Sequence, residues 1–407
     1  SEPIERARTI YQEYPNQFWV VIGATFIDRI GGALMFPFFS LYITRKFGVG
    51  MTEVGLLFTL FSVTGMLGST LGGALSDYLG RKSMILLGLV VSGLTSTGMG
   101  LVNSLPMFYL LSVLAGFFAD AAGPARQAML ADILPERKRA DGFGIMRVVM
   151  NLAVAIGPAV GGMLAATSYL LLFVIDTITS LITAVIVHRS VEETRPDSAR
   201  QEAEKNGFGA SFRGYGGVLK NSPFMLFLVF SLISTLVYTQ MYSTLSVYLR
   251  DFHLVPEQGF GLLMSLNAAM VVLLQFPITR CIKKFKPLLV MSAGTLLYAV
   301  GFGLYGVVGW YGFFLLAMVI ITLGEMLVAP TGQALVARFS PEDMRGRYMA
   351  VMGFSWMIPS AVGPLGAGLI MDNGDPRWIW YICFGLGLAA ASGFFWLKNR
   401  SPKSAET

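Results

Sequence analysis

Six ionisable residues of this 407-residue sequence lie inside long apolar stretches, where a charge is unfavourable unless it is paired or serves a function. If these stretches cross a bilayer, each charge costs roughly 2.5–3.5 kcal/mol, so such residues are candidates to bind a proton, an ion or a charged ligand. The six are Asp28, Arg29, Asp120, Arg147, Asp176 and Glu325. Both histidines, His188 and His253, lie near predicted helix ends. Proton binding inside the spans would therefore use the carboxylates.

The composition predicts that these stretches do cross a membrane. Hydrophobic residues make up 54%, charged residues 13%, and mean hydropathy is +0.63, whereas soluble proteins carry about 25% charged residues. The apolar blocks are about 20 residues long, the length that spans a hydrocarbon core of about 30 Å. We expect an all-α membrane protein with twelve transmembrane helices near 18–43, 52–76, 83–102, 106–131, 142–165, 169–188, 222–249, 256–279, 287–308, 311–336, 347–371 and 378–397.

A polar, Gly-rich stretch separates the first six spans from the second six. It predicts an N-terminal six-helix bundle at 1–188, a cytoplasmic linker at 189–221 and a C-terminal six-helix bundle at 222–407. Most of the 30 Lys and Arg residues lie in the termini, in the loops after even-numbered spans or at the adjoining helix ends. By the positive-inside rule, both termini are expected to be cytoplasmic, with the protein in the cell (inner) membrane. The first 17 residues are polar, and no cleavable signal peptide is expected.

The same features argue against several other kinds of protein. Net charge is +6, but the basic residues sit in short loops that set topology, so nucleic-acid binding is not expected. Cys281 and Cys383 are far apart, which indicates neither a disulfide framework nor a thiolate metal site. We recognise no group of nucleophilic and basic residues that would indicate an enzyme. We expect a monomer without a metal or cofactor, driven by a proton gradient.

The two halves repeat one another at an offset of 206 residues. The offset relates Ser40-Leu41-Tyr42 to Ser246-Val247-Tyr248, and it holds across spans 1, 2, 4 and 5. Further pairs are Pro124 and Pro330, Gln127 and Gln333, Pro135 and Pro341, Glu136 and Glu342, Arg139 and Arg345, Gly157 and Gly363, and Pro158 and Pro364. Two parallel repeats related by an axis along the membrane normal predict a cavity at their interface near the midplane.

The segment between spans 2 and 3, GALSDYLGRK, has glycines for close helix contact and charges at a short turn. It resembles the GxLaDrxGrk signature of the major facilitator superfamily, and this resemblance covers the whole chain through the twelve spans and the repeat. In that family the loop helps to hold the outward-facing state. The resemblance therefore implies that Asp77 makes a contact with the second half of the chain that stabilises this state. The gating residues implied are Gly73, Asp77, Gly80, Arg81 and Lys82, with Asp132 and Arg345 as neighbours. The corresponding loop of the second half, QFPITRCIKKFK, lacks the acid and the glycines, so the contact is expected to be asymmetric.

Span 5 carries Gly157, Pro158, Gly161 and Gly162 in the order GPAVGG. This resembles the GPxxGG motif of the drug:proton antiporter branch of the superfamily, and exchange rather than uptake is implied by that resemblance. Proline removes a helix hydrogen bond and glycines admit a neighbouring helix, so simple close packing accounts equally well for the residues.

The carboxylates are expected to carry the coupling proton. The run around Asp28 resembles the first span of tetracycline and multidrug exporters, which implies a proton or cation role, although an ion pair with Arg29 or Arg147 is the alternative. Asp120 and Glu325 occupy nearly equivalent places in the repeats, in spans that line the cavity in this fold. Span 4 lacks the family's usual arginine, for which Arg147 is a possible substitute. We interpret Asp176 as a packing or capping residue.

Thioether and aromatic side chains cluster in several spans and suit varied lipophilic ligands, including cations. The predicted substrate-binding residues are Arg29, Met35, Phe36, Arg147, Asn151, Tyr238, Met241, Tyr242 and Trp356. The leading hypothesis is proton-coupled export of lipophilic cations by alternating access, with the small-molecule substrate, protons and membrane lipids as partners. The alternative is an exporter or flippase of a lipid-like or anionic metabolite bound by Arg29 and Arg147. A nutrient importer or a membrane receptor is less favoured.

Overall fold

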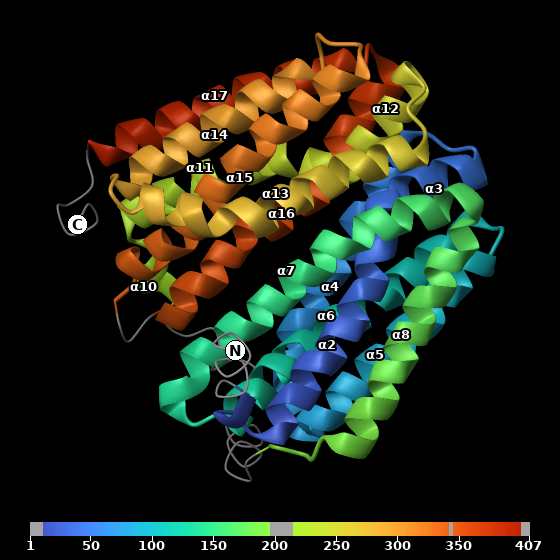
Figure 1. Ribbon diagram of the computed structural model, residues 1–407, viewed down its shortest axis with the longest axis vertical. Helices are drawn as coiled ribbons and strands as arrows, with labels where there is room; N and C mark the ends of the chain where they lie inside the picture. The colour runs from blue at the N-terminus through green and yellow to red at the C-terminus, as the bar shows by residue number, and fades with distance from the viewer. Residues whose placement is uncertain (1–10, 196–214, 342–344, 400–407) are drawn as a thin grey trace, which may run out of the picture. The chain divides into compact units, whose positions relative to one another are not determined.

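The computed structural model describes residues 11–195, 215–341 and 345–399, and almost all of them are helical (Figure 1). Within these residues, twelve helical segments are long and apolar enough to cross a membrane. The predicted twelve-span, all-α fold is therefore confirmed. The helices are α2 (Asn16–Met35), α3 (Phe39–Phe47), α4 (Met51–Leu79), α5 (Arg81–Leu101), α6 (Leu105–Ile133), α7 (Glu136–Thr167), α8 (Tyr169–Ser190), α10 (Tyr215–Leu219), α11 (Ser222–Ser243), α12 (Leu245–His253), α13 (Glu257–Ile282), α14 (Pro287–Leu304), α15 (Tyr311–Phe339), α16 (Arg345–Asn373) and α17 (Arg377–Lys398).

The first span of each repeat is broken near one end, at corresponding positions. In the first repeat, a 3-10 turn at Phe36–Phe38 separates α2 from α3, because Pro37 has no backbone N–H to continue the helix. In the second repeat the break falls at Thr244, between α11 and α12. There the Thr244 hydroxyl donates to the side-chain oxygen of Gln240 at 2.7 Å. Such local side-chain bonds compete with regular helix geometry.

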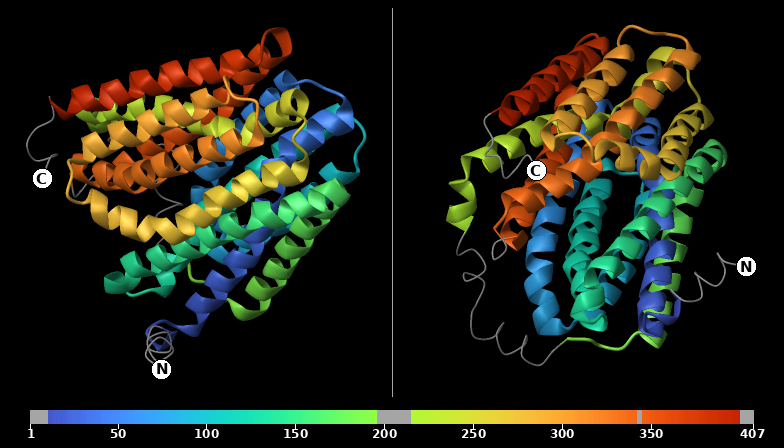
Figure 2. Two further views of the ribbon diagram at one scale, coloured as in Figure 1. Left: turned by 45° about the horizontal axis from the view of Figure 1, so that its top comes forward. Right: turned by 60° about the vertical axis from the view of Figure 1, so that its left-hand side comes forward.

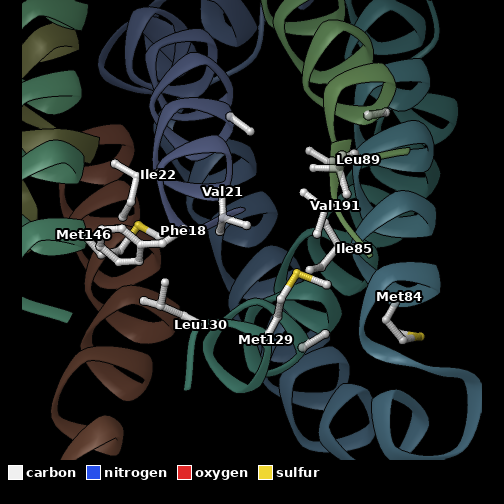
Figure 3. Close-up of a cluster of buried hydrophobic side chains, with 14 of the residues drawn as sticks. Phe18, Val21, Ile22, Met84, Ile85, Leu89, Met129, Leu130, Met146 and Val191 are labelled. Carbon is white, nitrogen blue, oxygen red and sulfur yellow. The ribbon is translucent and has the colours of Figure 1, made fainter. Parts of the chain in front are cut away.

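The chain forms two compact units, of which the first contains residues 1–36 and 63–210. In unit 1, α2 packs against α7 and α8, and α5 packs against α6 and α8. Apolar side chains from these helices meet in a buried cluster, in which Phe18, Ile22 and Met146 point toward one another (Figure 3). This cluster fixes the rotation of α2, and with it the direction of the polar side chains farther along that helix.

Unit 2 contains residues 37–62 and 211–407. Here α14 lies between α15 and α17, as Figure 2 shows, while α11 packs on α16 and α17 and α13 packs on α15. Phe224, Phe227 and Phe394 belong to its buried core. These units differ from the predicted domains 1–188 and 222–407 in one segment. Residues 37–62, which belong to the predicted N-terminal domain, make their contacts within unit 2.

The segment 37–62 is bound within unit 2 by polar contacts as well as by packing. Asp372, at the end of α16, accepts hydrogen bonds from the backbone N–H groups of Met51 at 2.9 Å and Thr52 at 2.7 Å. Its carboxylate thereby caps the first turn of α4, where a negative charge is favourable. Arg45 forms an ion pair with Glu257 at 3.0 Å. The outer part of α4 is thus anchored to α16.

Candidate functional site

A cavity of about 270 Å³ lies inside unit 2, and it is the candidate binding site. Its wall is formed by side chains from α11, α14, α15 and α16. The wall includes Ser234, Tyr238, Tyr298, Glu325, Gly332, Gly353 and Trp356. Among the described residues that line it, Glu325 is the one that carries a charge. The cavity is near the lower end of the range of about 300–1,000 Å³ for small-molecule sites, which suits a compact ligand.

Glu325 projects from α15 and is held by neighbouring polar groups. Its Oε2 accepts a hydrogen bond from the side-chain amide of Asn267 at 2.8 Å, and the same amide donates to the Thr322 hydroxyl at 3.0 Å. Tyr238 lines the same cavity as Glu325. These contacts set the direction of a carboxylate that is largely removed from solvent.

Aromatic rings from α11, α14 and α16 line the same cavity as the carboxylate. The Tyr238 ring lies 5.3 Å from the Tyr298 ring and 5.8 Å from the Trp356 ring, which it meets edge to face. The Tyr238 and Tyr242 hydroxyls are 3.4 Å apart. A positive ligand in this cavity would meet one carboxylate and several π faces, both of which attract cations. A proton on Glu325 would remove the negative charge that attracts the positive ligand.

Unit 1 has charged groups where the unit 2 repeat has this cavity. The 206-residue offset relates Arg126 to Gly332, Arg147 to Gly353, and Asp28 to Ser234. Two arginines of the first repeat are therefore replaced by glycines in the wall of the cavity. The long side chains of the first repeat thus have no counterpart at these two positions of the cavity wall.

Asp28 is paired with a residue that the sequence analysis did not single out. Its Oδ2 lies 3.5 Å from Arg126 Nη2, and its Oδ1 accepts a hydrogen bond from the Ser180 hydroxyl at 3.1 Å. The Asp28 and Arg126 side chains are 17% and 15% exposed. Asp28 is therefore in an ion pair, as the alternative interpretation expected, but its partner is Arg126 and not Arg29 or Arg147. Arg126 lies near the end of the predicted fourth span, between Pro124 and Gln127, which both recur in the second repeat.

The other predicted charges of unit 1 have different settings. Asp120, Arg29 and Arg147 are exposed, as is Asn151. The carboxylate of Asp120 lies so close to Gly65 of α4 that a side chain there would clash with it. These four residues lie outside the wall of the unit 2 cavity.

Asp176 and Gly31 lie at a tight crossing of α8 and α2. A Cβ atom at Gly31 would come within 2.9 Å of the Asp176 backbone. The crossing is consistent with the packing role predicted for Asp176, because only a glycine fits at the contact point.

The predicted aromatic and thioether ligands separate into three groups. Tyr238 and Trp356 line the cavity, and Tyr242 touches Tyr238. Met241 is fully buried and does not line the cavity. Met35 and Phe36 belong to unit 1, where the Ser96 hydroxyl donates to the Met35 sulfur at 3.9 Å. Two residues of the site, Asn267 and Tyr298, were missed. Asn267 could have been found as a polar amide within the apolar span 8. No feature of the sequence distinguished Tyr298 from the other aromatic residues of the spans.

The Gly73–Lys82 motif forms a charged turn whose described contacts lie within unit 1. Gly80 has φ of 107°, a conformation that favours glycine. Arg81 lies 3.4 Å from Asp132, and its guanidinium donates to the Ser76 hydroxyl at 2.9 Å. The Lys82 ammonium donates to the backbone oxygen of His188 at 2.7 Å. The side chains of Asp77 and Arg345 lie outside the described residues, so the contact proposed for Asp77 stays a prediction.

The GPxxGG motif lies where α7 crosses α2. A Cβ at Gly157 would lie 2.5 Å from the Cβ of Ala33. Pro158, Gly161 and Gly162 are buried on the same helix. The corresponding glycine of the second repeat, Gly363, faces α11 with looser clearance, 3.1 Å to the nearest side-chain atoms. The motif therefore provides a close helix crossing in both repeats, tightest in the first.

Comparison with known proteins identifies the family of this chain. The chain matches the family described as the Major Facilitator Superfamily over residues 21–259 and 249–407. It is 28% identical over 392 residues to a protein of Planococcus maritimus named Na(+), Li(+), K(+)/H(+) antiporter, covering 89% of this chain and 91% of that protein. It is 26% identical over 183 residues to the quinolone resistance protein NorA of Staphylococcus aureus, covering 44% of this chain and 47% of that protein.

Solved structures share the fold at low sequence identity. A mutant of the nucleoside transporter NupG superposes with a TM-score of 0.80 at 13% identity, covering 94% of this chain and 100% of that one. A peptide transporter POT in complex with sulfate gives 0.77 at 14% identity, covering 96% and 95%. The fold seen here is therefore one that membrane transporters use.

Proposed function

Because this chain belongs to the Major Facilitator Superfamily and is a multi-pass membrane transporter, we propose that it exports lipophilic cations in exchange for protons. The observation that carries the proposal is the placement of Glu325 in an aromatic cavity in which no other described residue is charged. Ring faces and apolar groups favour a lipophilic ligand, and the single carboxylate favours a positive one. The resemblance of Gly157–Gly162 to the antiporter motif supports exchange.

Coupling would follow from competition at one carboxylate. Glu325 holds either a proton or the cation, so proton entry from one side would displace the cation toward the other. The two repeats would alternate access to this site by moving relative to one another, as parallel repeats in transporters allow. The Asp28–Arg126 pair would then maintain the packing of unit 1 and would not itself exchange protons.

A monovalent metal cation is the second candidate substrate, and the relative from Planococcus maritimus favours it. Sodium and potassium need several oxygen ligands, by analogy with other hard cations. The oxygens of Glu325 and Thr322 lie close together, because both accept hydrogen bonds from the Asn267 amide. The aromatic wall, however, contributes ring faces rather than oxygen ligands, so we place the organic cation first.

A transport assay separates these functions. The purified protein in liposomes is given an imposed pH gradient and either ethidium, as the lipophilic cation, or radiolabelled sodium or potassium. We expect gradient-driven ethidium movement that Glu325→Gln abolishes and that Asp120→Asn, the matched acid of the first repeat, retains. Gradient-driven movement of sodium or potassium without ethidium would favour the second candidate. Equal ethidium movement by the parent and Glu325→Gln would contradict the proposal.

A further inference from the structure

The loop after α13 is the repeat counterpart of the Gly73–Lys82 motif, but its chemistry is reversed. The 206-residue offset places Lys283 at the position of Asp77 and Lys286 at the position of Gly80. The loop reads CIKKFKP, with three lysines and no acid. A motif that carries a carboxylate in the first repeat has become purely cationic in the second.

In unit 1, the helix that follows the motif is capped by a carboxylate from the chain. Glu193, just after α8, accepts hydrogen bonds from the backbone N–H groups of Arg81 at 2.8 Å and Lys82 at 3.1 Å. An anion is thus bound at the first turn of α5, where the helix dipole and the unsatisfied N–H groups favour negative charge.

In unit 2, the corresponding helix α14 begins at Pro287 without a side-chain cap. A cavity of about 320 Å³ lies beside its first turn. The basic residues in the wall of this cavity are Lys283, Lys284, Lys286 and Arg338. Among the described lining residues none is acidic. Pro287 has no backbone N–H, so an anion here would be bound chiefly by the ammonium and guanidinium groups.

We infer that this basic cavity binds the phosphate of an anionic phospholipid. Four cationic side chains among the described lining residues have the charge and the donors to bind a phosphate. The charge of the loops predicts that this face is cytoplasmic, the leaflet surface at which basic clusters meet anionic lipids.

Apolar side chains beside the cavity favour a lipid over a free phosphate ion. Phe285 lines the cavity and is 58% exposed. One turn before the lining residue Thr279, Phe276 is 71% exposed on α13, and Leu273 of the same helix is 72% exposed. These side chains continue from the cavity along the membrane-spanning helix, where acyl chains would lie. A soluble phosphate would gain nothing from them.

The test is a lipid titration of the purified full-length protein in detergent, followed by native mass spectrometry. Dioleoyl phosphatidylglycerol, dioleoyl phosphatidylcholine and inorganic phosphate are compared as ligands. The test variant combines Lys283→Gln, Lys284→Gln and Lys286→Gln. The control variant combines Arg189→Gln, Lys220→Gln and Lys398→Gln, which removes the same charge from the same predicted face but outside the cavity. Thermal unfolding in detergent verifies that both variants are folded.

The parent and the control variant are expected to bind phosphatidylglycerol in preference to phosphatidylcholine. Each ammonium contributes roughly a fivefold factor near an anionic lipid, so the test variant should lose about a hundredfold in phosphatidylglycerol affinity. Equal affinity of the parent for both lipids, or an equal loss in both variants, would overturn the site. Inorganic phosphate that displaces phosphatidylglycerol at comparable concentration would overturn the assignment to a lipid. Should the triple variant fail to fold, single Lys283→Gln and Lys284→Gln variants are each expected to lose about fivefold.

Discussion

The Asp28→Asn variant removes the charge of Asp28 and keeps the shape of its side chain. It tests whether the role of Asp28 is to form the ion pair with Arg126. Asp28→Asn leaves the Arg126 guanidinium without its partner in a setting where the two side chains are only 15–17% exposed. Loss of one partner of a fully buried pair costs about 3–5 kcal/mol. Because the closest approach is 3.5 Å and some solvent access remains, we take about 2–3 kcal/mol. On the scale of about 2–4 °C per kcal/mol, the unfolding midpoint should fall by about 5–10 °C.

The double variant Asp28→Asn/Arg126→Gln supplies the decisive comparison. It removes both charges, so no buried charge is left uncompensated, and we expect it to recover more than half of the loss in stability. Ser180→Ala, which removes only the neutral bond to Asp28, should cost about 1 kcal/mol.

The assay is thermal unfolding of the four purified proteins in detergent, with gradient-driven ethidium transport measured in liposomes. We expect the double variant to transport as well as to fold. A double variant that is no more stable than Asp28→Asn would refute the pairing argument. Recovered stability without gradient-driven transport, but with downhill flux intact, would instead assign the coupling proton to Asp28.

Two further predictions concern helix contacts, and both can be measured on purified protein. Gly157→Ala places a methyl group against Ala33 and should cost about 1–3 kcal/mol, whereas Gly363→Ala, whose nearest neighbours are side-chain atoms at 3.1 Å, should cost less; thermal unfolding compares them, and equal effects would contradict the difference in packing. Asp372→Ala removes the cap of α4 at Met51, which we expect to cost about 0.5–2 kcal/mol and to speed hydrogen exchange in the first turn of α4. Unchanged exchange there would show that the cap contributes nothing.

The fold was predictable because a bilayer imposes a length on every span. Each of the twelve predicted spans overlaps a helix of the structure. A close helix neighbour at Gly157 was predictable, because a glycine in a span admits another helix, but the sequence did not show that this neighbour is α2. The break at Pro37 could be read from the sequence as well. The matching break at Thr244 could not, because it depends on hydroxyl bonds rather than on proline.

The site was only partly predictable, because side-chain partners depend on helix rotation. Glu325, Tyr238 and Trp356 were singled out and do meet at one cavity. Their spans are apolar on all sides, however, so the sequence does not show which face of α14 presents Tyr298. Arg126 was missed for a related reason, since a long side chain near a helix end can reach inward or outward.

If one carboxylate, Glu325, holds either a proton or the transported cation, then protons and ethidium must compete for it. This competition is measured most directly by the equilibrium affinity of the purified protein for ethidium between about pH 8 and about pH 5, together with proton release on binding in weakly buffered solution. We expect that affinity falls as pH falls, that binding releases protons, and that Glu325→Gln binds more weakly with neither dependence. A Glu325→Gln variant that keeps the pH dependence and proton release of the parent, or a parent affinity that rises on acidification, would contradict it.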